Sequence, residues 1–293
     1  MGANSAGWRR IAGALLAAGL IPGLISGCST TSEATPAVPR QSHAAKGSAK
    51  ATDGPDGKGS RDGAAGTAAA YRRWGITPLA APPAPPKTKP VTLRADGDIP
   101  VISDIPVKDR VVFITVDDGA EKDPKFLTMM QELRIPFSMF LTDSAISSDY
   151  GYFERLRKLG NGIHNHTLTH PNLRTLGAAA QKREICGQQD KLTARYGTGP
   201  RLLRPPYGNW NEDTRAAARA CGAQAIVLWR ESMQIRNMQY QRGDKKLHPG
   251  DIILAHFRGP SDLKGTTMTE MTAHLLRRIQ EQGFTVARLE DYL

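Results

Sequence analysis

Residues 111–119 read VVFITVDDG, an apolar run that ends in two aspartates and a glycine. The apolar part is too short for a helix and is rich in β-branched residues, so residues 111–115 are expected to form a buried strand. Six similar runs follow, each again too short for a helix. They cover residues 137–141, 162–164, 201–203, 225–229, 251–255 and 284–287. The sequence therefore predicts seven strands between residue 111 and the C-terminus.

Helical patterns alternate with these strands. Apolar side chains recur along residues 125–134 at the spacing of an amphipathic helix. Two further helical segments, residues 214–221 and 268–282, each stop at a glycine that suits a helix C-terminus. Strands that alternate with helices indicate βαβ units, and hence an α/β fold with a parallel sheet. Seven such units are enough to close as a barrel.

Polar and aromatic side chains follow five of the expected strands at the point where each strand ends. In parallel sheets and α/β barrels, reactive groups gather at the carboxyl ends of the strands. The residues at these positions are Asp117, Asp118, His166, His170, Arg204, Tyr207, Trp229 and His256. We therefore expect these side chains to meet at one rim of the sheet.

A metal site is indicated by His166 and His170, which lie four residues apart. In a helical turn both imidazoles share one face and suit a single metal ion, although a solvated helix face is the ordinary alternative. Asp118 supplies a third ligand from a strand end, and Gly119 lets the backbone turn sharply there. Two histidines and one carboxylate leave open positions on zinc, which is typical of a catalytic site. His164 is expected to point the other way.

Asp117 and His256 are the candidates for proton transfer. Two adjacent aspartates in different environments can divide the chemistry, with Asp118 on the metal and Asp117 as the general base. His256 at the end of the sixth strand is the natural general acid opposite a metal and a base. The alternatives are an ordinary Asp-Asp-Gly turn and a structural histidine.

Four motifs together resemble the polysaccharide deacetylase (NodB-homology) family. They are residues 115–119 (TVDDG), 166–170 (HTLTH), 204–208 (RPPYG) and 254–256 (LAH), in the order that the family has them. The resemblance covers about residues 100–293. It implies the NodB-like fold, a distorted (β/α)7 barrel, in agreement with the seven expected strands.

The resemblance also implies which residues hold the metal and which acts as base. Asp118, His166 and His170 would bind Zn²⁺ or another divalent transition metal. Asp117 would be the base, and Arg204 would pair with it and set its orientation and charge.

The remaining roles fall on the other rim residues. By resemblance, the backbone N–H of Tyr207 helps stabilise the oxyanion and His256 protonates the departing amine. The family often has an aspartate and a tryptophan after the fifth strand, where residues 228–234 read LWRESMQ in this sequence. Trp229 is the candidate to line the substrate pocket with Tyr207, and Glu231 is the candidate substitute for the aspartate that would tune His256.

The N-terminal third of the sequence predicts export and anchoring. Residues 1–27 carry an arginine pair and an interrupted apolar stretch that is too short to span a bilayer, as in a signal peptide. They lead into LISGC, which resembles the lipobox of bacterial lipoproteins and implies lipidation of Cys28, with an ordinary secretory signal as the alternative. Residues 28–98, rich in Ala, Gly, Ser, Thr and Pro, are expected to be a disordered tether, and residues 99–293 the catalytic domain. We expect a protein anchored on the outer face of the cytoplasmic membrane, facing the cell wall.

Charge and cysteine content limit the possible partners. The formal net charge of +11 is diffuse, with +6 in residues 1–98 and +5 in residues 99–293. Because no stripe of Lys and Arg is interleaved with aromatics, we expect no nucleic-acid partner. We expect a monomer. Cys186 and Cys221 either pair in an oxidising environment or stay as two buried thiols.

These features predict a metal-dependent hydrolase that removes N-acetyl groups from the N-acetylglucosamine-type residues of a cell-wall or chitin-like polysaccharide. Its expected partners are that acetylated polysaccharide and the membrane. One alternative is an O-acetyl esterase acting on a xylan-type glycan, since the same site serves esters. Another is a catalytically weak, metal-bearing glycan-binding lipoprotein, which the altered motif after the fifth strand favours.

Overall fold

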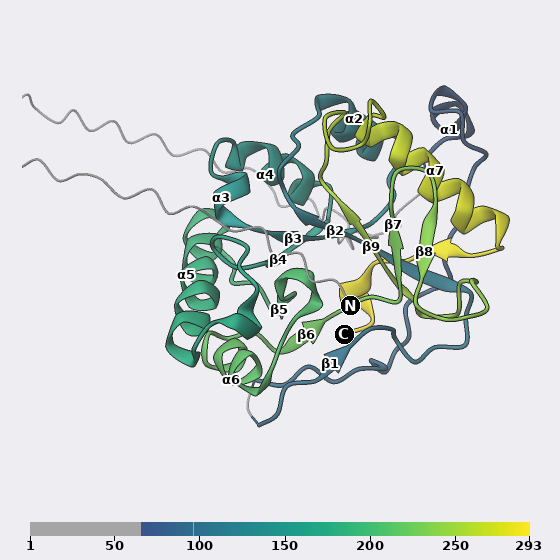
Figure 1. Cartoon of the computed structure of the whole chain (residues 1–293). Helices are drawn as coiled ribbons and strands as arrows, with labels where there is room; N and C mark the ends of the chain where they lie inside the picture. The colour runs from purple at the N-terminus through teal and green to yellow at the C-terminus, as the bar shows by residue number, and fades with distance from the viewer. Residues whose placement is uncertain (1–65, 96) are drawn as a thin grey trace, which may run out of the picture. The chain divides into compact units, whose positions relative to one another are not determined.

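The computed structural model describes residues 66–95 and 97–293, whose strands form one curved sheet (Figure 1). The strands in this part of the chain are β1 (Val101–Ile102), β2 (Val111–Asp118), β3 (Ser138–Leu141), β4 (Gly162–Asn165), β5 (Leu202–Leu203), β6 (Ala225–Val227), β7 (Glu231–Met233), β8 (Met238–Tyr240), β9 (Ile252–His256) and β10 (Thr285–Val286). Seven of them match the seven expected runs, so that prediction is confirmed. The strands β1, β7 and β8 have only two or three residues each and leave no pattern in the sequence.

The sheet has the order β1-β6-β5-β4-β3-β2-β9-β7-β8, and β10 pairs with the start of β2. All neighbours run parallel except the β7–β8 hairpin. After β1 the chain crosses to the start of β9, where Asp104 bridges Asp251 and the Ile105 N–H donates to the Gly250 carbonyl at 2.8 Å. The result is a distorted, incompletely closed α/β barrel whose parallel strands end at one rim.

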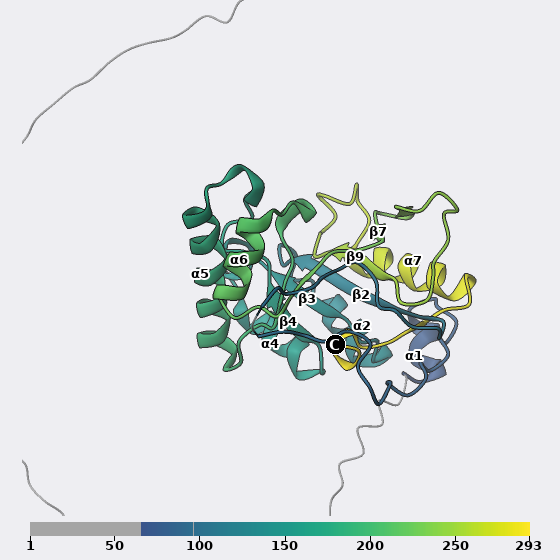
Figure 2. The same ribbon diagram turned by 90° about the horizontal axis from the view of Figure 1, so that it is seen from below.

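Helices cover the outside of the sheet (Figures 1 and 2). In the described residues they are α1 (Ala68–Arg73), α2 (Pro124–Leu133), α3 (Asp143–Ile146), α4 (Tyr150–Lys158), α5 (Ala178–Tyr196), α6 (Glu212–Ala220) and α7 (Met268–Glu281). The three helices expected from the sequence are α2, α6 and α7. The apolar stripe of α2 is buried as its spacing predicts. Within residues 66–95 and 97–293, no helix has both the length and the apolarity needed to cross a membrane.

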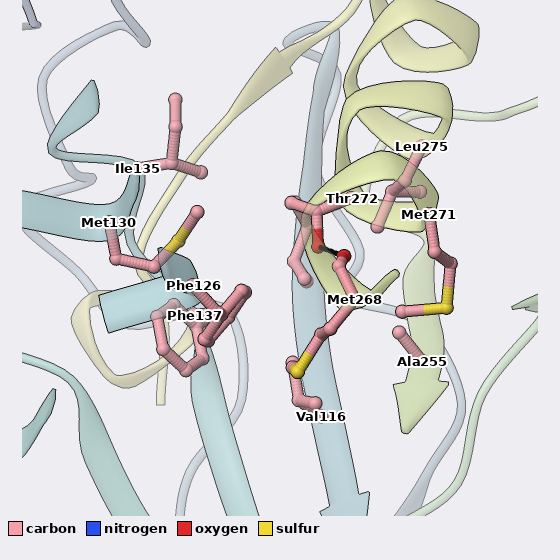
Figure 3. A pocket seen from close by; sticks show the side chains of 11 residues that line it. Val116, Phe126, Met130, Ile135, Phe137, Ala255, Met268, Met271, Thr272 and Leu275 are labelled. Atoms are coloured by element: carbon pink, nitrogen blue, oxygen red, sulfur yellow. Dashed lines mark hydrogen bonds between the residues drawn. The ribbon is translucent and has the colours of Figure 1, made fainter. Parts of the chain in front are cut away.

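A small apolar cavity of about 20 Å³ lies in the core between α2, α7 and the strands β2 and β9 (Figure 3). Phe126 and Met130 line it from α2, and Met268 and Leu275 line it from α7. The hydroxyl of Thr272, also in the lining, already donates to the Met268 carbonyl at 2.8 Å. A water needs two to four polar partners, so this space is a packing gap behind the rim and not a ligand site.

The expected tether of residues 28–98 is wrong for its C-terminal part, because residues 66–95 pack against the domain. Tyr71 of α1 is fully buried, and Ile76 and Leu79 are buried after it. A few spaced apolar anchors thus hold a segment whose overall composition is that of a linker. The folded domain therefore begins well before residue 99.

Polar contacts fix the same segment. The Trp74 indole N–H donates to Glu132 at the end of α2 at 2.7 Å. From α7, Arg277 donates to the Gly75 carbonyl at 3.0 Å and Gln280 to the Pro78 carbonyl at 2.9 Å. The expected signal peptide, the lipidation site Cys28 and the rest of the expected tether lie outside the described residues.

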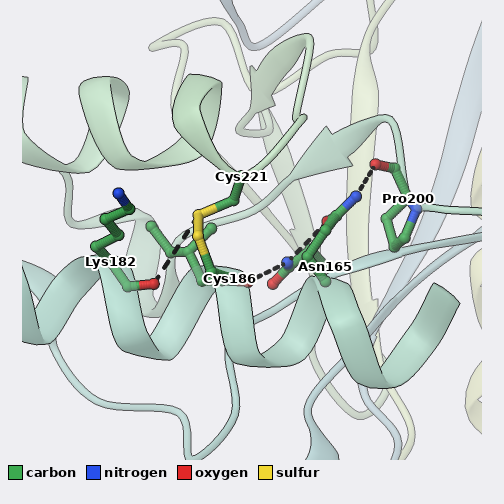
Figure 4. The surroundings of a disulfide bond; sticks show 7 residues. Asn165, Lys182, Cys186, Pro200 and Cys221 are labelled. Carbon is green, nitrogen blue, oxygen red and sulfur yellow. Dashed lines mark hydrogen bonds between the residues drawn. A yellow bond between two sulfur atoms is a disulfide. The ribbon is translucent and has the colours of Figure 1, made fainter. Parts of the chain in front are cut away.

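A disulfide joins Cys186 on α5 to Cys221 at the end of α6 (Figure 4). Of the two alternatives for these cysteines, the structure has the bonded one, with Cα atoms 4.9 Å apart. The bond ties together two helices, of which α5 packs beside β4 and α6 beside β6. Asn165 at the end of β4 donates to the Ile185 carbonyl on α5 at 2.9 Å. The disulfide therefore supports the helix layer beside the loop that follows β4.

Replacing both cysteines by serine is expected to lower the free energy of unfolding by about 3–4 kcal/mol, the loop-entropy value for a cross-link of this span. The two cysteines are 35 residues apart in the sequence. Urea unfolding of the double variant, beside the parent with and without reductant, measures this. A loss below about 1 kcal/mol would show that the bond contributes little to the fold.

Candidate active site

The site is built on the end of β2, where the chain turns away from the sheet. Asp118, the last residue of β2, has a φ of 72°, and Gly119 follows with a φ of 93°. A Cβ at Gly119 would overlap the side chain of Ile146, so glycine is required there by both space and backbone angle. This turn separates the directions of Asp117 and Asp118 and lets the two carboxylates serve different partners.

Asp118, His166 and His170 converge on one point. Asp118 Oδ1 lies 3.5 Å from His166 Nε2 and 3.3 Å from His170 Nε2. The three ligand atoms lie within 4.8 Å of one another. Ligands about 2.0–2.2 Å from a tetrahedral zinc lie roughly 3.3–3.6 Å apart, so the spacing fits a shared ion. Asp118 Oδ1 is also buried and lacks a hydrogen-bond partner among the described residues.

Electrostatics at this cluster favour a carboxylate beside imidazoles. Burial alone would raise the pKa of Asp118, but the adjacent His166 and His170 outweigh burial and hold that pKa well below its usual range. Burial disfavours charge on His166, yet Asp117 and Asp118 outweigh it and raise the pKa of that imidazole. The Nδ1 atom of His166 lies 2.7 Å from the Arg204 carbonyl, which leaves Nε2 facing Asp118.

The expected helical turn at residues 166–170 is wrong. Thr167 and His170 have φ values of 71° and 61°, which no right-handed helix contains. The Asn165 side chain instead accepts from the Thr167 N–H at 2.9 Å, and the Thr167 hydroxyl accepts from the His170 N–H at 3.2 Å. The two imidazoles are therefore brought together by a loop with left-handed backbone angles. The spacing of four residues does not reflect a helical turn here.

Left-handed backbone is concentrated at this site. Among the described residues, seven other than glycine have a positive φ, and four of these are Asp118, Thr167, His170 and Tyr207. Such conformations cost on the order of 1 kcal/mol each for residues with a Cβ and gather at functional sites. The positive φ values at the site therefore lower the stability of the fold, and they set the directions of the site's side chains.

Asp117 is held by Arg204 as the resemblance implied. Arg204 is fully buried, and its Nη1 donates to Asp117 Oδ1 and to the Thr115 hydroxyl, each at 2.7 Å. The guanidinium also donates to the carbonyls of Val227 and Leu228 at 3.0 and 3.1 Å and lies 4.2 Å from the centre of the Phe140 ring. The second oxygen of Asp117 lies 3.7 Å from His166 Nε2. It is on the side of Asp118, His166 and His170, the three candidate ligands that we call the metal cluster.

Sequence reasoning missed three residues that support this arrangement, namely Thr115, Phe140 and Asn165. Thr115 carries a signal in hindsight, since it lies on the same face of β2 as Asp117, two residues earlier. Phe140 and Asn165 carry no such signal in the sequence, because their roles depend on the register of β3 and β4 beside β2.

Tyr207 and Trp229 line the rim beside the metal cluster. Tyr207 is 63% exposed, and its ring centre lies 4.8 Å from that of His170. A Cβ at Gly208 would approach the Trp229 ring to 3.0 Å, so the indole lies directly against the loop that carries Tyr207. Two aromatic faces at an open rim suit the apolar face of a sugar ring.

His256 lies across the site from the metal cluster, at the end of β9. It pairs in register with Asp117 of β2. Burial lowers the pKa of His256 below its ordinary value and Arg258 adds to this, while Asp117 and Asp118 act in the opposite direction. In the part of the chain that the structure describes, no carboxylate oxygen lies within ion-pair distance of the ring.

The idea that Glu231 replaces the missing aspartate is wrong. Glu231 pairs in register with Ile253, three residues before His256 on β9, and is fully buried there. Its nearest charged groups are Arg242 at 3.5 Å and Asp251. Burial and the neighbouring Asp251 raise the pKa of Glu231 to about 9. Burial thus favours the protonated form of this carboxyl, which lies beneath the rim and does not contact His256.

This pKa makes stability depend on pH. The folded-state pKa of about 9 lies above the usual value, so stability present at pH 5 is lost as the pH rises toward 9. We expect Glu231→Gln, which mimics the protonated form, to reduce that loss by on the order of 1–3 kcal/mol between pH 5 and pH 9. Urea unfolding at pH 5, 7 and 9 measures it, and parallel pH profiles for the parent and the variant would contradict it.

Comparisons with known proteins agree with this geometry. A family model described as polysaccharide deacetylase matches residues 104–226. An uncharacterised protein of Streptomyces coelicolor is 44% identical over 195 residues, which cover 66% of this chain and 77% of that protein. The peptidoglycan-N-acetylmuramic acid deacetylase PdaA of Bacillus subtilis is 25% identical over 196 residues, covering 64% of this chain and 72% of that protein.

Among solved structures, a CE4 family pseudoenzyme from Bacillus anthracis aligns with a TM-score of 0.55. The sequences are 19% identical, and the alignment covers 66% of this chain and 68% of that chain, so it bears on the fold alone. The chain belongs to the polysaccharide deacetylase family. It is accordingly a hydrolase that acts on carbohydrate.

Proposed function

We propose that this protein is a zinc-dependent deacetylase that removes N-acetyl groups from N-acetylglucosamine-type residues of a cell-wall or chitin-like polysaccharide. The observation that carries the proposal is the convergence of Asp118, His166 and His170 beside an Asp117 that Arg204 holds in place. PdaA, which is similar to this chain, is named as a peptidoglycan-N-acetylmuramic acid deacetylase, and this supports a cell-wall glycan as the substrate.

The donor set fits a divalent transition metal. Two imidazole nitrogens and one carboxylate oxygen are the ligands that zinc takes in hydrolytic sites, with positions left for water and substrate. When bound there, the metal would supply a Lewis acid that polarises the acetyl carbonyl. His166 and His170 can bind only in their neutral forms, so loading the site releases protons and grows stronger as the pH rises.

Asp117 would take the proton from the attacking water. Its Oδ1 is occupied by Arg204 and its Oδ2 faces the metal cluster, so one oxygen is fixed while the other accepts the proton. Arg204 is fully buried and donates to Oδ1, which keeps the carboxylate correctly oriented before the substrate arrives. The base is therefore preorganised.

Tyr207 and His256 would act on the acetamide group of the substrate. The Tyr207 backbone N–H would donate to the acetyl oxygen as negative charge develops there, a contribution of about 3–4 kcal/mol for a well-placed donor. His256 would give its proton to the departing nitrogen, so that water and the acetamide become acetate and a free amine. Because the pKa of His256 is lowered, the protonated fraction falls early as the pH rises.

The direct test is acetate release from N-acetylglucosamine oligomers by the metal-loaded protein. We expect release that chelation abolishes and added Zn²⁺ restores. Release from acetylated xylan alone would replace the proposal by an O-acetyl esterase. Binding to glycans without any acetate release would favour the non-catalytic alternative. The observation behind that alternative is that, among the described residues, no carboxylate lies within ion-pair distance of His256.

We also propose that the chain is exported and held at the membrane by lipid on Cys28. The support is the signal-like sequence of residues 1–27 together with the Cys186–Cys221 disulfide, since such bonds persist in oxidising compartments. Metabolic labelling with a radioactive fatty acid should mark the parent and not Cys28→Ala. Equal labelling of both proteins would remove Cys28 from this role.

A further inference from the structure

A groove of about 390 Å³ opens between the turn of the β7–β8 hairpin and the loop that follows β9. Residues 234–237 line it from the hairpin, and Leu263, Lys264 and Thr266 line it from the loop. We call it the hairpin groove. Its volume lies within the range of about 300–1,000 Å³ that is usual for ligand sites.

The hairpin groove lies on the same rim of the sheet as His256. The strands β7 and β9 are parallel neighbours, with Ser232 opposite Leu254. The turn that begins at Gln234 follows the end of β7, and His256 is the last residue of β9. Parallel strands end at one rim, so the groove opens on the rim that carries His256. Figure 1 shows β7 and β8 beside β9 at this edge of the barrel.

The charged residues that line the groove are both basic. Arg236 and Lys264 are exposed, and within residues 66–95 and 97–293 neither forms an ion pair. Arg258, also exposed, follows β9 and acts on His256 with positive charge. The carboxylate that Arg236 influences is Glu270, which is already engaged by the Thr267 N–H at 2.8 Å and hydroxyl at 2.9 Å in a helix cap.

Two basic side chains without an ion-pair partner among the described residues make the groove complementary to an anion. An arginine fork matches a carboxylate with two parallel hydrogen bonds, and a lysine beside it adds a second positive charge. Asp262 lies in the same loop but does not line the groove. A glycan that extends from the reacting sugar past His256 would therefore meet positive charge first.

We propose that the hairpin groove binds a carboxylate-bearing sugar next to the reacting unit, so that the enzyme prefers acetylated polysaccharides that carry carboxylates over neutral ones. This inference rests on the proposed deacetylase function. It assigns Arg236 and Lys264 as specificity-determining residues, with Gln234 and Asn237 as neutral hydrogen-bonding groups in the same groove.

The test compares two substrates that differ only in charge. One is a short alternating oligomer of N-acetylglucosamine and N-acetylmuramic acid, and the other is the same oligomer with its lactyl carboxylates methylated. The measurement is the ratio of kcat/KM for acetate release from the charged and the methylated oligomers. We expect a ratio of about 10 for the parent in low salt, falling toward 1 in 0.5 M NaCl because salt screens exposed charges.

Three double variants of the whole chain locate the effect. Arg236→Gln with Lys264→Gln should bring the ratio near 1, and Arg236→Lys with Lys264→Arg should keep most of it. Lys108→Gln with Arg134→Gln removes the same charge from exposed positions that precede β2 and follow α2, at the amino-terminal ends of the strands. That control should keep the parent's ratio.

A parent ratio of 1, or an unchanged ratio when Arg236→Gln is combined with Lys264→Gln, would overturn the groove inference and leave the proposed function intact. A ratio that falls equally in the Lys108 and Arg134 control would also overturn it, since net charge and not the groove would be responsible. No acetate from either oligomer would instead overturn the proposed function itself. Thermal unfolding of each variant shows that the comparison is between folded proteins.

Discussion

Asp117→Asn is expected to lower kcat for acetate release by about 10³-fold while leaving metal binding close to that of the parent. The substitution keeps the shape of the side chain but removes the basic oxygen that faces the metal cluster. Asparagine can still accept a hydrogen bond from Arg204 through its amide oxygen, so the local fold should persist. KM should change little, because the loss falls on proton transfer.

The matched control is Asp190→Asn, an exposed aspartate on α5 that takes part in no hydrogen bond or ion pair within the described residues. It should keep the kcat of the parent. Metal content of both variants is measured after zinc loading and desalting. An Asp117→Asn enzyme with near-parental kcat would remove Asp117 from the role of base, and one without metal would make it a ligand.

The second large effect is expected at the metal cluster itself. Asp118→Asn and His170→Gln should each weaken zinc binding by at least about 100-fold, since even indirect partners of metal ligands are worth 10–100-fold. Asparagine tolerates the left-handed backbone that residue 118 requires, so loss of charge is separated from backbone strain. Acetate release should fall in parallel at limiting zinc.

Calorimetric titration with Zn²⁺ measures this, and His248→Gln is the control. His248 is a histidine of the same protein near Asp244 and Asp251, away from the cluster. It should bind zinc as the parent does. If Asp118→Asn and His170→Gln kept the parental affinity and His248→Gln lost it, the assignment of the metal site would be wrong.

The strands of this fold were accessible from the sequence because each is a short apolar run bounded by turn residues. The strands β1, β7 and β8 were not, since two or three residues carry no period. Residues 66–95 were mistaken for tether because composition averages over the segment, whereas burial depends on a few anchors such as Tyr71. Composition predicts whether a segment can form a core of its own. This segment instead packs its few apolar side chains against the core of the barrel.

At the site, the sequence predicts which residues take part better than it predicts their geometry. Strand-end positions brought Asp117, Asp118 and Arg204 together as expected, because a parallel sheet places strand ends at one rim. The conformation of residues 166–170 was mispredicted, since the side chain of Asn165 organises that loop and spacing alone does not reveal it. Glu231 was misplaced because the register of β7 against β9, which decides its neighbours, is absent from the sequence.

The account depends on one ion shared by Asp118, His166 and His170 beside Asp117. A crystal structure of the zinc-loaded protein, with anomalous diffraction recorded on both sides of the zinc absorption edge, tests this most directly. We predict one strong anomalous peak about 2.0–2.2 Å from Asp118 Oδ1 and from the Nε2 atoms of His166 and His170. A zinc-loaded crystal with no peak at these three residues, or with its zinc bound elsewhere, would contradict the account.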